Sequence, residues 1–441
     1  MIDSVFEPFT HLSGEPKYIF CCLHCGATYP SGPFRLHCDR NHPPSLLRAV
    51  YTSKQLIVKP DLPGLFRYID WLPVEQYLTD VGKPITYQST GLAQQLGLEQ
   101  LWISFSGYWP ERHGQLLTCS FKELEAITVL ARTPKDNAKV LAISSAGNTG
   151  RAFAHIYSRY HIPLCLVIPE NSLPAIWSTQ AFSSTIRLVV VNQSQDYYDA
   201  IALGRLISKL DGFFPEGGAA NIGRRDGMGL TVLDAAVTLG QIPDHYFQAV
   251  GSGTGGIAAW EANLRLLEDG RFGDRTMTLH LAQNAPFTPM VDAWQASDRH
   301  IKDMTESEAK TRIREASAKV LTNRQPAYSI AGGVYDVLTA SQGSMYAVTN
   351  AEALEARQMF ADLEGIDISP ASGVAAAALR QAVQANKIQK TETVLLNITS
   401  GGFERLQQDR ILHYLQPSVG VDLKNISPDV VALQRDKFCP D

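Results

Sequence analysis

The sequence lacks a basic excess and lacks any long apolar run. Its 441 residues carry a formal charge of −5 at pH 7 and give a pI near 6.1, so no surplus of positive charge favours a nucleic-acid or anionic-membrane partner. No charge-free apolar run approaches the roughly 20 residues that a membrane helix needs. Asp3 and Glu7 stand where a signal peptide would need positive charge and then an apolar run. We therefore expect a cytoplasmic protein that binds neither nucleic acid nor membrane.

Cysteine is also scarce, and its seven copies are too few and too irregularly spaced for a disulfide framework. Cys22-Leu-His-Cys25 and Cys38-Asp-Arg-Asn-His42 frame a short loop, as in a small zinc ribbon. A second Cys-x-x-Cys pair is missing, so Cys38 needs another ligand from its surroundings. The candidates for that ligand are His37, His42 and Cys21. The sequence leaves open two alternatives: zinc bound by Cys22, Cys25, Cys38 and His42, or a decayed ribbon that packs without metal.

The length allows two or three packed units with buried cores. From about residue 84 onward, short apolar runs alternate with helical patterns, which is typical of parallel sheets covered by helices on both faces. The pattern predicts strands over 140–144, 164–168, 186–191 and 246–250, and helices over 151–160, 199–210 and 257–268. We therefore expect an α/β fold built from βαβ units, followed by an irregular tail of about twenty residues.

A glycine-rich turn separates the strand expected over 246–250 from the following helix. Its residues are Gly251, Ser252, Gly253, Thr254, Gly255 and Gly256. A helix N-terminus directs free N–H groups and a positive dipole end at such a turn, which favours a bound phosphate. The glycine spacing does not fit the dinucleotide fingerprint, and no ribose-binding acid follows at the expected distance. A tight turn without a ligand is the alternative.

A second turn of small residues lies between the strand expected over 140–144 and its helix. It contains Ser145, Ala146, Gly147, Asn148 and Thr149. Its hydroxyl, amide and backbone donors at a helix N-terminus would suit a carboxylate. Helix capping is the alternative, since Ser, Asn and Thr are the usual capping residues, but capping alone explains only one of them.

Lys122 is a candidate for imine chemistry. Ser120 and Glu123 have the spacing of a capping box, which predicts that Lys122 begins a helix. The positive end of the helix dipole disfavours the charge of a lysine in the first turn and so favours the neutral amine that imine formation requires. Read alone, Lys122 is better explained as a solvated surface charge.

Four motifs taken together resemble one enzyme superfamily. Ser120-Phe-Lys122, Ser145 to Thr149, Gly251 to Gly256 and Asn397-Ile-Thr-Ser-Gly-Gly402 occur in the order found in fold-type II pyridoxal-phosphate (PLP) enzymes, the threonine synthase and cysteine synthase superfamily. The resemblance covers about residues 65 to 403. It implies a tryptophan synthase β-like fold of two doubly wound parallel-sheet domains with the cofactor in the cleft. The expected division is an N-terminal zinc-ribbon-like extension at 1–64, a large domain at 65–120 and 240–420, a small domain at 121–239 and a tail at 421–441.

The resemblance also implies roles for individual residues. Lys122 would form the Schiff base with the cofactor, and Asn148 would bind the cofactor's 3′ oxygen. The 251–256 turn would bind the cofactor phosphate. Ser400 would face the pyridine nitrogen as a neutral partner. A hydroxyl does not protonate the ring strongly, so elimination and replacement are the expected reactions.

Within this superfamily the chain resembles the cysteate synthases. The similarity rests on Cys119 to Ala126, Glu216-Gly-Gly, Asn221 to Gly229, Asp244 to Val250, Ala258-Ala-Trp260 and Gln283-Asn284. It implies that O-phospho-L-serine and sulfite give L-cysteate and phosphate through an aminoacrylate, with Lys122 as the base, in sulfonate biosynthesis such as coenzyme M formation. Threonine synthases usually have Asp-Arg after the lysine, whereas this chain has Glu123 and Leu124.

The leaving group and the nucleophile of that reaction are both anionic, so the site needs fixed positive charge. The candidates are Arg151, Arg224 and Arg225, and the alternative for each is a structural ion pair.

Three other functions remain open. The first is a threonine synthase that acts on phosphohomoserine, and the second is phosphoserine replacement by sulfide or another nucleophile. The third is a non-catalytic scaffold that binds a phosphorylated amino acid. In each enzymatic case we expect a homo-oligomer.

Overall fold

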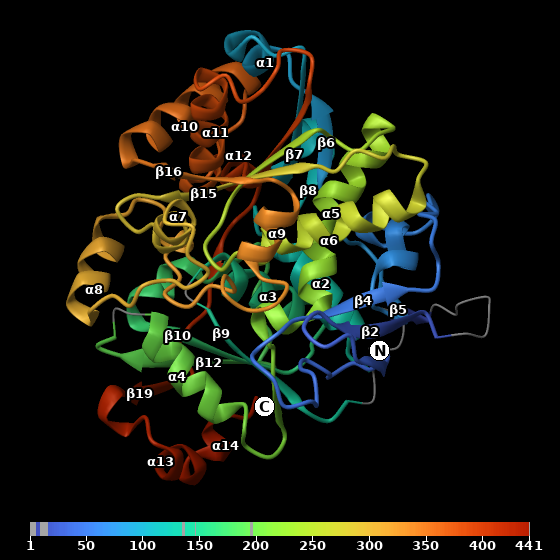
Figure 1. Cartoon of the computed structure of the whole chain (residues 1–441). Coiled ribbons are helices and arrows are strands. Elements are labelled where there is room, and N and C mark those ends of the chain that lie inside the picture. The colour runs from blue at the N-terminus through green and yellow to red at the C-terminus, as the bar shows by residue number, and fades with distance from the viewer. Residues whose placement is uncertain (1–5, 9–15, 135–136, 146, 195–196, 441) are drawn as a thin grey trace.

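The computed structural model describes residues 6–8, 16–134, 137–145, 147–194 and 197–440. A mainly parallel sheet and an entirely parallel sheet, with helices packed around them, form the body of the molecule, and a small antiparallel sheet from the N-terminal segment lies at one side (Figure 1). This architecture agrees with the expected α/β class. No helix among the described residues is long and apolar enough to cross a membrane.

The larger sheet has seven strands, of which five run parallel. Its order is β16 (Ser344–Val348), β15 (Thr278–Asn284), β14 (His245–Ala249), β17 (Thr393–Gly401), β7 (Gln100–Trp109) and β6 (Ile85–Gln88), with β8 (Gly114–Gln115) paired to β7. Strands β6 and β8 are antiparallel to β7. The helices that pack around this sheet are α1 (Gly91–Leu96), α5 (Ile222–Leu239), α6 (Thr254–Asp269), α7 (Pro289–Gln295), α9 (Val334–Ala340), α10 (Asn350–Glu364), α11 (Pro370–Gln384) and α12 (Phe403–Asp409).

The smaller sheet is entirely parallel. Its order is β13 (Phe213–Pro215), β9 (Val140–Ser144), β10 (Leu164–Pro169), β12 (Ile186–Asn192) and β19 (Val419–Asp422). Strand β10 is buried along its whole length, which explains why it reads as an uninterrupted apolar run. Helices α2 (Lys122–Arg132), α3 (Asn148–Arg159) and α4 (Tyr197–Ile207) pack around this sheet and its neighbours.

The C-terminal residues are not the irregular tail that the sequence suggested. Strand β19 adds an edge to the smaller sheet by pairing with β12, and α13 (Pro428–Leu433) packs against α4. A last helix, α14 (Arg435–Phe438), buries Phe438. Short strands that pair only over long sequence distances carry too weak a local pattern to be recognised, which explains the wrong expectation.

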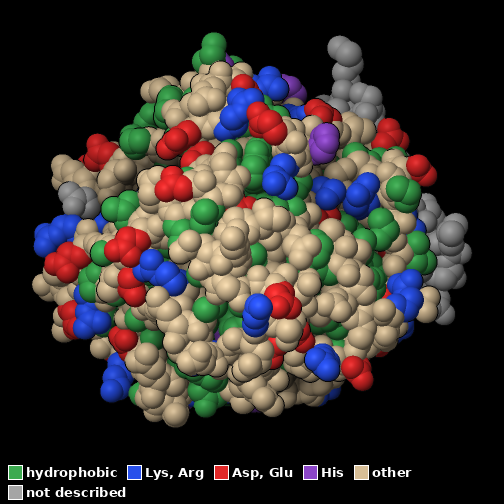
Figure 2. Space-filling view, turned by 90° about the horizontal axis from the view of Figure 1, so that it is seen from above, with side chains coloured by type: hydrophobic (Ala, Val, Ile, Leu, Met, Phe, Trp, Pro, Cys, Tyr) green, Lys and Arg blue, Asp and Glu red, His purple; other side chains and the backbone are tan. Residues whose placement is uncertain are grey.

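The remaining elements are small. The N-terminal sheet has the order β3 (Thr28–Pro30), β2 (Tyr18–Cys22) and β4 (Leu47–Tyr51), and two further pairs join β1 (Phe6–Pro8) to β5 (Gln76–Leu78) and β11 (Trp177–Ser178) to β18 (His413–Tyr414). Helix α8 (Glu306–Glu315) is solvent-exposed over most of its surface. Acidic and basic side chains are interspersed on the face shown in Figure 2.

A buried arginine connects the N-terminal sheet to the main body. Arg225 of α5 is fully buried, and its Nε lies 2.9 Å from Glu261 Oε2 of α6. Its other two nitrogens donate to the carbonyl oxygens of Ala219 and of Leu47 in β4. One guanidinium therefore satisfies groups from three separate segments, and its removal would leave the Glu261 charge poorly compensated.

We predict that Arg225→Ala lowers the free energy of unfolding by about 3–5 kcal/mol, because it breaks a buried ion pair from one side. Urea denaturation followed by tryptophan fluorescence measures this change. Lys54→Ala is the matched control, since Lys54 pairs with Glu268 at the exposed surface, and it should change stability by less than about 1 kcal/mol. Equal effects of the two substitutions would contradict the role of Arg225.

Candidate active site

Lys122 begins α2, as the sequence predicted, but the capping box does not form. Glu123 Oε2 instead accepts hydrogen bonds from the backbone N–H and the hydroxyl of Thr118, at 2.7 and 2.8 Å. Ser120 Oγ only accepts a long contact of 3.3 Å from the backbone N–H of Lys122. The Glu123 carboxylate therefore fixes the segment that precedes α2 by hydrogen bonds. Lys122 is the first residue of that helix.

The Lys122 amine lies in a largely enclosed site. Its side chain is 16% exposed, and Nζ is 3.0 Å from Glu125 Oε2 and 3.5 Å from Met228 Sδ. Burial is the main cause that lowers the pKa of Lys122; Arg224 also lowers it, whereas Glu125 acts in the opposite direction. A lysine with a lowered pKa supplies more neutral amine, the form that attacks a carbonyl group. This environment contradicts the alternative of a solvated surface charge.

The end of β17 lies directly against the segment that precedes Lys122. Ser120 and Ser400 form an antiparallel bridge, and the N–H of Phe121 donates to the Thr399 carbonyl at 2.9 Å. Ser400 Oγ donates to the carbonyl of Cys119 at 2.6 Å. The structure thus brings Ser400 and Lys122, which lie far apart in the sequence, to the same place.

The glycine-rich turn connects β14 to the N-terminus of α6, as expected. Gly253 has a φ of +81°, a conformation that side chains rarely adopt. A Cβ on Gly255 would lie 2.2 Å from Gln248 Nε2, so a larger residue there would require the buried Gln248 side chain to move. Ser252 Oγ and Thr254 Oγ1 are 2.8 Å apart. The turn presents the first N–H groups of a 16-residue helix together with these hydroxyls, an arrangement suited to a phosphate.

The second turn connects β9 to α3, and its polar groups have different partners. Ser145 Oγ accepts from the backbone N–H of Gly150 at 2.8 Å, so Ser145 acts as a helix cap. Asn148 Oδ1 accepts from Arg151 at 2.7 Å, which turns the amide nitrogen of Asn148 away from Arg151. Thr149 Oγ1 accepts from Arg224 at 3.3 Å. Ala146, also expected in this site, lies outside the described residues.

One short segment touches both turns. Val320 lies against a glycine of each turn. If Gly147 carried a Cβ atom, that atom would be 3.0 Å from Val320 Cγ1, and a Cβ atom on Gly251 would be 3.0 Å from the Val320 carbonyl oxygen. Val320 belongs to a single turn of 3-10 helix, Lys319–Leu321. The β9–α3 and β14–α6 turns therefore lie close together, which the sequence separation of about one hundred residues does not reveal.

Arg224 lies in the site between two carboxylates. Its Nη1 is 2.8 Å from Glu216 Oε2, and its Nε is 3.2 Å from Glu125 Oε2. Burial works against the charge of Arg224, but the two carboxylates together raise its pKa above the usual value. Burial also raises the pKa of Glu216, and Arg224 opposes that change.

The other two candidate arginines are bound to groups of the protein itself. Arg225 is fully buried and donates to Glu261 and to two backbone carbonyls. Arg151 donates twice to the carbonyl of Thr118, at 3.0 and 3.1 Å, and its guanidinium stacks 4.4 Å from the Trp177 ring centre. Burial lowers the pKa of Arg151 to about 10. Arg151 therefore connects Asn148 to the segment that precedes Lys122.

Sequence reasoning missed the roles of Glu125 and Glu216 around Lys122 and Arg224. The i, i+3 spacing of Lys122 and Glu125 was the only local signal, since such residues share one face of a helix. Glu216 stands in a loop, and no periodicity connects it to Arg224.

The N-terminal cysteines form a compact cluster. The ligand atoms of Cys22, Cys25, Cys38 and His42 all lie within 4.8 Å of one another. Cys22 Sγ is 3.4 Å from His42 Nε2, and the sulfur atoms of Cys25 and Cys38 are 3.7 Å apart. His42 Nδ1 is 2.7 Å from the Pro43 carbonyl, which orients Nε2 toward the cluster. Of the three candidate partners for Cys38, the structure places His42 in the cluster.

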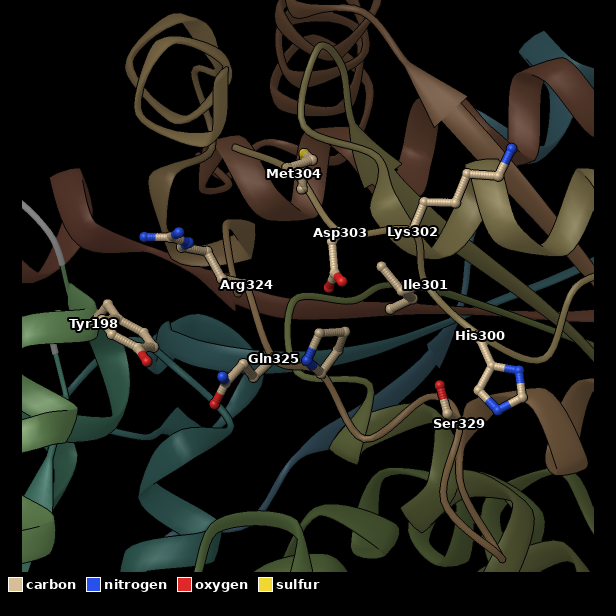
Figure 3. Close-up of a pocket in the computed structure, with 10 residues that line it drawn as sticks. Tyr198, His300, Ile301, Lys302, Asp303, Met304, Arg324, Gln325 and Ser329 are labelled. Carbon is tan, nitrogen blue, oxygen red and sulfur yellow. The ribbon is translucent and has the colours of Figure 1, made fainter. Parts of the chain in front are cut away.

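A cavity of about 350 Å³ lies beside the glycine-rich turn, and Lys122 does not line it. The N–H of Ala327, next to its lining, donates to the Ser252 carbonyl at 3.0 Å. Figure 3 shows Arg324 and Gln325 extending toward Tyr198. Basic Lys302 and Arg324 are mixed with acidic Asp303 in the lining, so the cavity selects no single ligand charge. Its lining residues are Tyr198, His300, Ile301, Lys302, Asp303, Met304, Arg324, Gln325, Pro326 and Ser329.

Similar solved structures share the fold. A pyridoxal 5′-phosphate-dependent aspartate racemase superposes with a TM-score of 0.56 at 15% identity, covering 74% of this chain and 92% of its own. Maize serine racemase gives a TM-score of 0.53 at 14% identity, covering 74% of this chain and 91% of its own. At these identities the likeness concerns the fold alone.

Sequence comparison is more specific. The cysteate synthase of Methanosarcina acetivorans is 49% identical over 415 residues, which cover 94% of this chain and 98% of that protein. The cysteate synthase of Methanoregula boonei is 49% identical over 408 residues, 92% of this chain and 95% of that protein. Residues 81–400 match the family described as pyridoxal-phosphate dependent enzyme. The chain belongs to this family of pyridoxal-phosphate dependent enzymes, together with those cysteate synthases.

Proposed function

We propose that the protein catalyses a PLP-dependent β-replacement in which O-phospho-L-serine and sulfite give L-cysteate and phosphate. The observation that carries this proposal is the enclosed Lys122 amine, which Glu125 and Arg224 connect to Thr149 in the turn before α3, in a chain 49% identical to a cysteate synthase over 415 residues. Nothing in the site favours phosphohomoserine as a substrate or sulfide as a nucleophile.

The donor set fits the cofactor. Lys122 would bind it covalently, the 251–256 turn would bind its phosphate, and the Asn148 amide, oriented by Arg151, would donate to its 3′ oxygen. Ser400 would face the pyridine nitrogen as a neutral hydroxyl. When bound, the cofactor supplies the electron sink for negative charge at the substrate's α carbon.

The chain's own residues would position the substrate and move its proton. The N-terminus of α3, with Gly147, Asn148 and Thr149, would bind the substrate carboxylate, and Ser145 would support that turn as a cap. Lys122 would take the α proton as a general base, a task suited to an amine whose pKa burial has lowered. Arg224 reaches this turn through its contact with Thr149, whereas the Arg151 guanidinium is held by Asn148 and the carbonyl of Thr118. We propose Arg224, and neither Arg151 nor Arg225, as the cation that borders the substrate.

Lys122→Ala should abolish the visible absorbance that PLP acquires on binding to a lysine, and phosphate release from phosphoserine should fall at least about 1,000-fold. Absorbance spectra and a phosphate assay measure the two effects. Lys390→Ala is the control, because Lys390 pairs with Glu99 at the exposed surface. A variant at position 122 that keeps both the band and the activity would contradict the assignment. A wild-type protein without any such band would support the non-catalytic scaffold.

Supplied with phosphoserine and equal sulfite and sulfide, the enzyme should form cysteate as its main product. Mass spectrometry identifies the product, and phosphohomoserine serves as the competing substrate in a parallel reaction. Phosphate release from phosphohomoserine alone would overturn the proposal in favour of a threonine synthase. Cysteine as the main product would indicate sulfide as the nucleophile.

We also propose that Cys22, Cys25, Cys38 and His42 bind zinc. A tetrahedron with Zn–S bonds of about 2.3 Å has sulfur atoms about 3.8 Å apart, close to the 3.7 Å between Cys25 and Cys38. The same distance is far too long for a disulfide. Such a site would stabilise the N-terminal segment, where the N–H of Leu46 donates to the Ala331 carbonyl at 2.9 Å.

Purified protein should contain about one zinc ion per chain, and Cys22→Ser and Cys25→Ser should remove it and lower the thermal unfolding midpoint, because a structural zinc site contributes folding energy. Elemental analysis and calorimetry measure these effects. Cys21→Ser is the matched control, since Cys21 adjoins Cys22 in β2 but lies outside the cluster. Zinc-free wild-type protein, with all three variants equally stable, would indicate a ribbon that packs without metal.

A further inference from the structure

Glu125 is a buried carboxylate that the reaction outlined above does not use. Its side chain has no solvent exposure, and its Oε2 lies 3.0 Å from Lys122 Nζ and 3.2 Å from Arg224 Nε. Among the described residues, no hydrogen-bond donor reaches its Oε1. A buried carboxylate with one unsatisfied oxygen costs stability, so its presence beside the reacting amine requires an explanation.

The charges around Lys122 show what Glu125 contributes. Arg224 already has a carboxylate partner in Glu216, at 2.8 Å, so one negative charge balances it. Glu125 is the second carboxylate of the cluster, and it is the one in contact with the Lys122 amine. Two cations and two carboxylates therefore balance when Lys122 is protonated. If Lys122 were always neutral, Glu125 would carry an uncompensated buried charge.

We propose that Glu125 is a positioning residue that holds the free Lys122 amine in place and stabilises the proton that Lys122 takes from the substrate. This inference rests on the proposed role of Lys122 as the base. In that step the substrate's Cα–H bond breaks, an N–H bond forms on Nζ, and the electron pair stays with the substrate. The proton returns to the same carbon after the nucleophile has added.

Four titratable groups interact with Glu125, one from its own helix and three from other parts of the chain. They are Lys122 of α2, Arg224 of α5, Glu216 in the loop after β13 and Tyr197 of α4. Burial raises the pKa of Tyr197 to about 12, so Tyr197 stays neutral near pH 8. The negative charge of Glu125 raises the pKa of Lys122, whereas burial and Arg224 lower it. Removing the Glu125 charge should therefore lower the pKa of Lys122 further.

The first test measures Lys122 without any turnover. Cofactor-free protein is reductively methylated with formaldehyde over a range of pH, and the Lys122 peptide is quantified by mass spectrometry. Glu125→Gln should move the midpoint of Lys122 methylation to lower pH by about one unit or more, the usual effect of an opposite charge in contact. Glu125→Asp keeps the charge and should stay near the wild-type midpoint. Glu216→Gln removes a carboxylate that contacts Arg224 but not Lys122, so it should cause a smaller shift.

The second test uses the PLP-loaded enzyme. Glu125→Gln should lower kcat for phosphate release roughly ten-fold or more and leave the KM for phosphoserine nearly unchanged, because the substrate does not contact Glu125. Glu125→Asp should recover part of that loss. An unchanged midpoint together with an unchanged kcat in Glu125→Gln would overturn the proposal. If Glu125→Gln does not fold, Glu125→Asp provides the test, because its shorter side chain moves the carboxylate away from Lys122. A wild-type kcat in Glu125→Asp would then overturn the proposal.

The two proposals fail in different ways. The visible band of lysine-bound cofactor tests Lys122 and should survive in every Glu125 variant that folds. If wild-type protein lacks the band, the role of Lys122 fails first. If the band persists while the Glu125 substitutions change neither the midpoint nor kcat, only the role of Glu125 fails.

Discussion

The buried amine of Lys122 is the constraint on which the rest of the site depends. An ammonium group removed from water is unstable unless charges nearby compensate it. Burial therefore favours the neutral amine over the ammonium form. Burial pushes Lys122 toward the neutral form, and Glu125 pulls it back toward the charged form. Two opposing influences of this kind give a lysine that can both take up and release a proton. Arg224 and Glu216 complete the balance of charge around it.

The same cluster connects elements that the chain order keeps apart. Arg224 of α5 touches Thr149 at the start of α3, and Arg151 of α3 joins Asn148 to the carbonyl of Thr118, just before Lys122. Ser400, at the end of β17, donates to the carbonyl of Cys119. The groups proposed to contact the cofactor are therefore fixed by hydrogen bonds before any ligand binds. Such preorganisation reduces the entropy that must be lost when reacting groups are aligned.

Much of the fold could be predicted from the sequence, because buried parallel strands and amphipathic helices have distinct patterns. The strand over 140–144 and the turns before α3 and α6 lie where the sequence placed them, and Lys122 begins its helix as expected. The errors involve contacts between distant residues. Glu123 accepts a hydrogen bond from Thr118 and does not form the expected capping box with Ser120. Arg225 pairs with Glu261. Spacing rules describe neighbours along one element and cannot find such partners.

The most direct test of the central claim is to locate the covalent attachment of the cofactor. Reducing the PLP-loaded protein with borohydride converts the lysine–cofactor bond into a stable amine, which peptide mapping by mass spectrometry can assign to a single residue. The account predicts that the cofactor mass is found on the peptide that contains Lys122 and on no other. Recovery of that mass on a different lysine, or an unmodified Lys122 peptide from protein that had bound PLP, would contradict it.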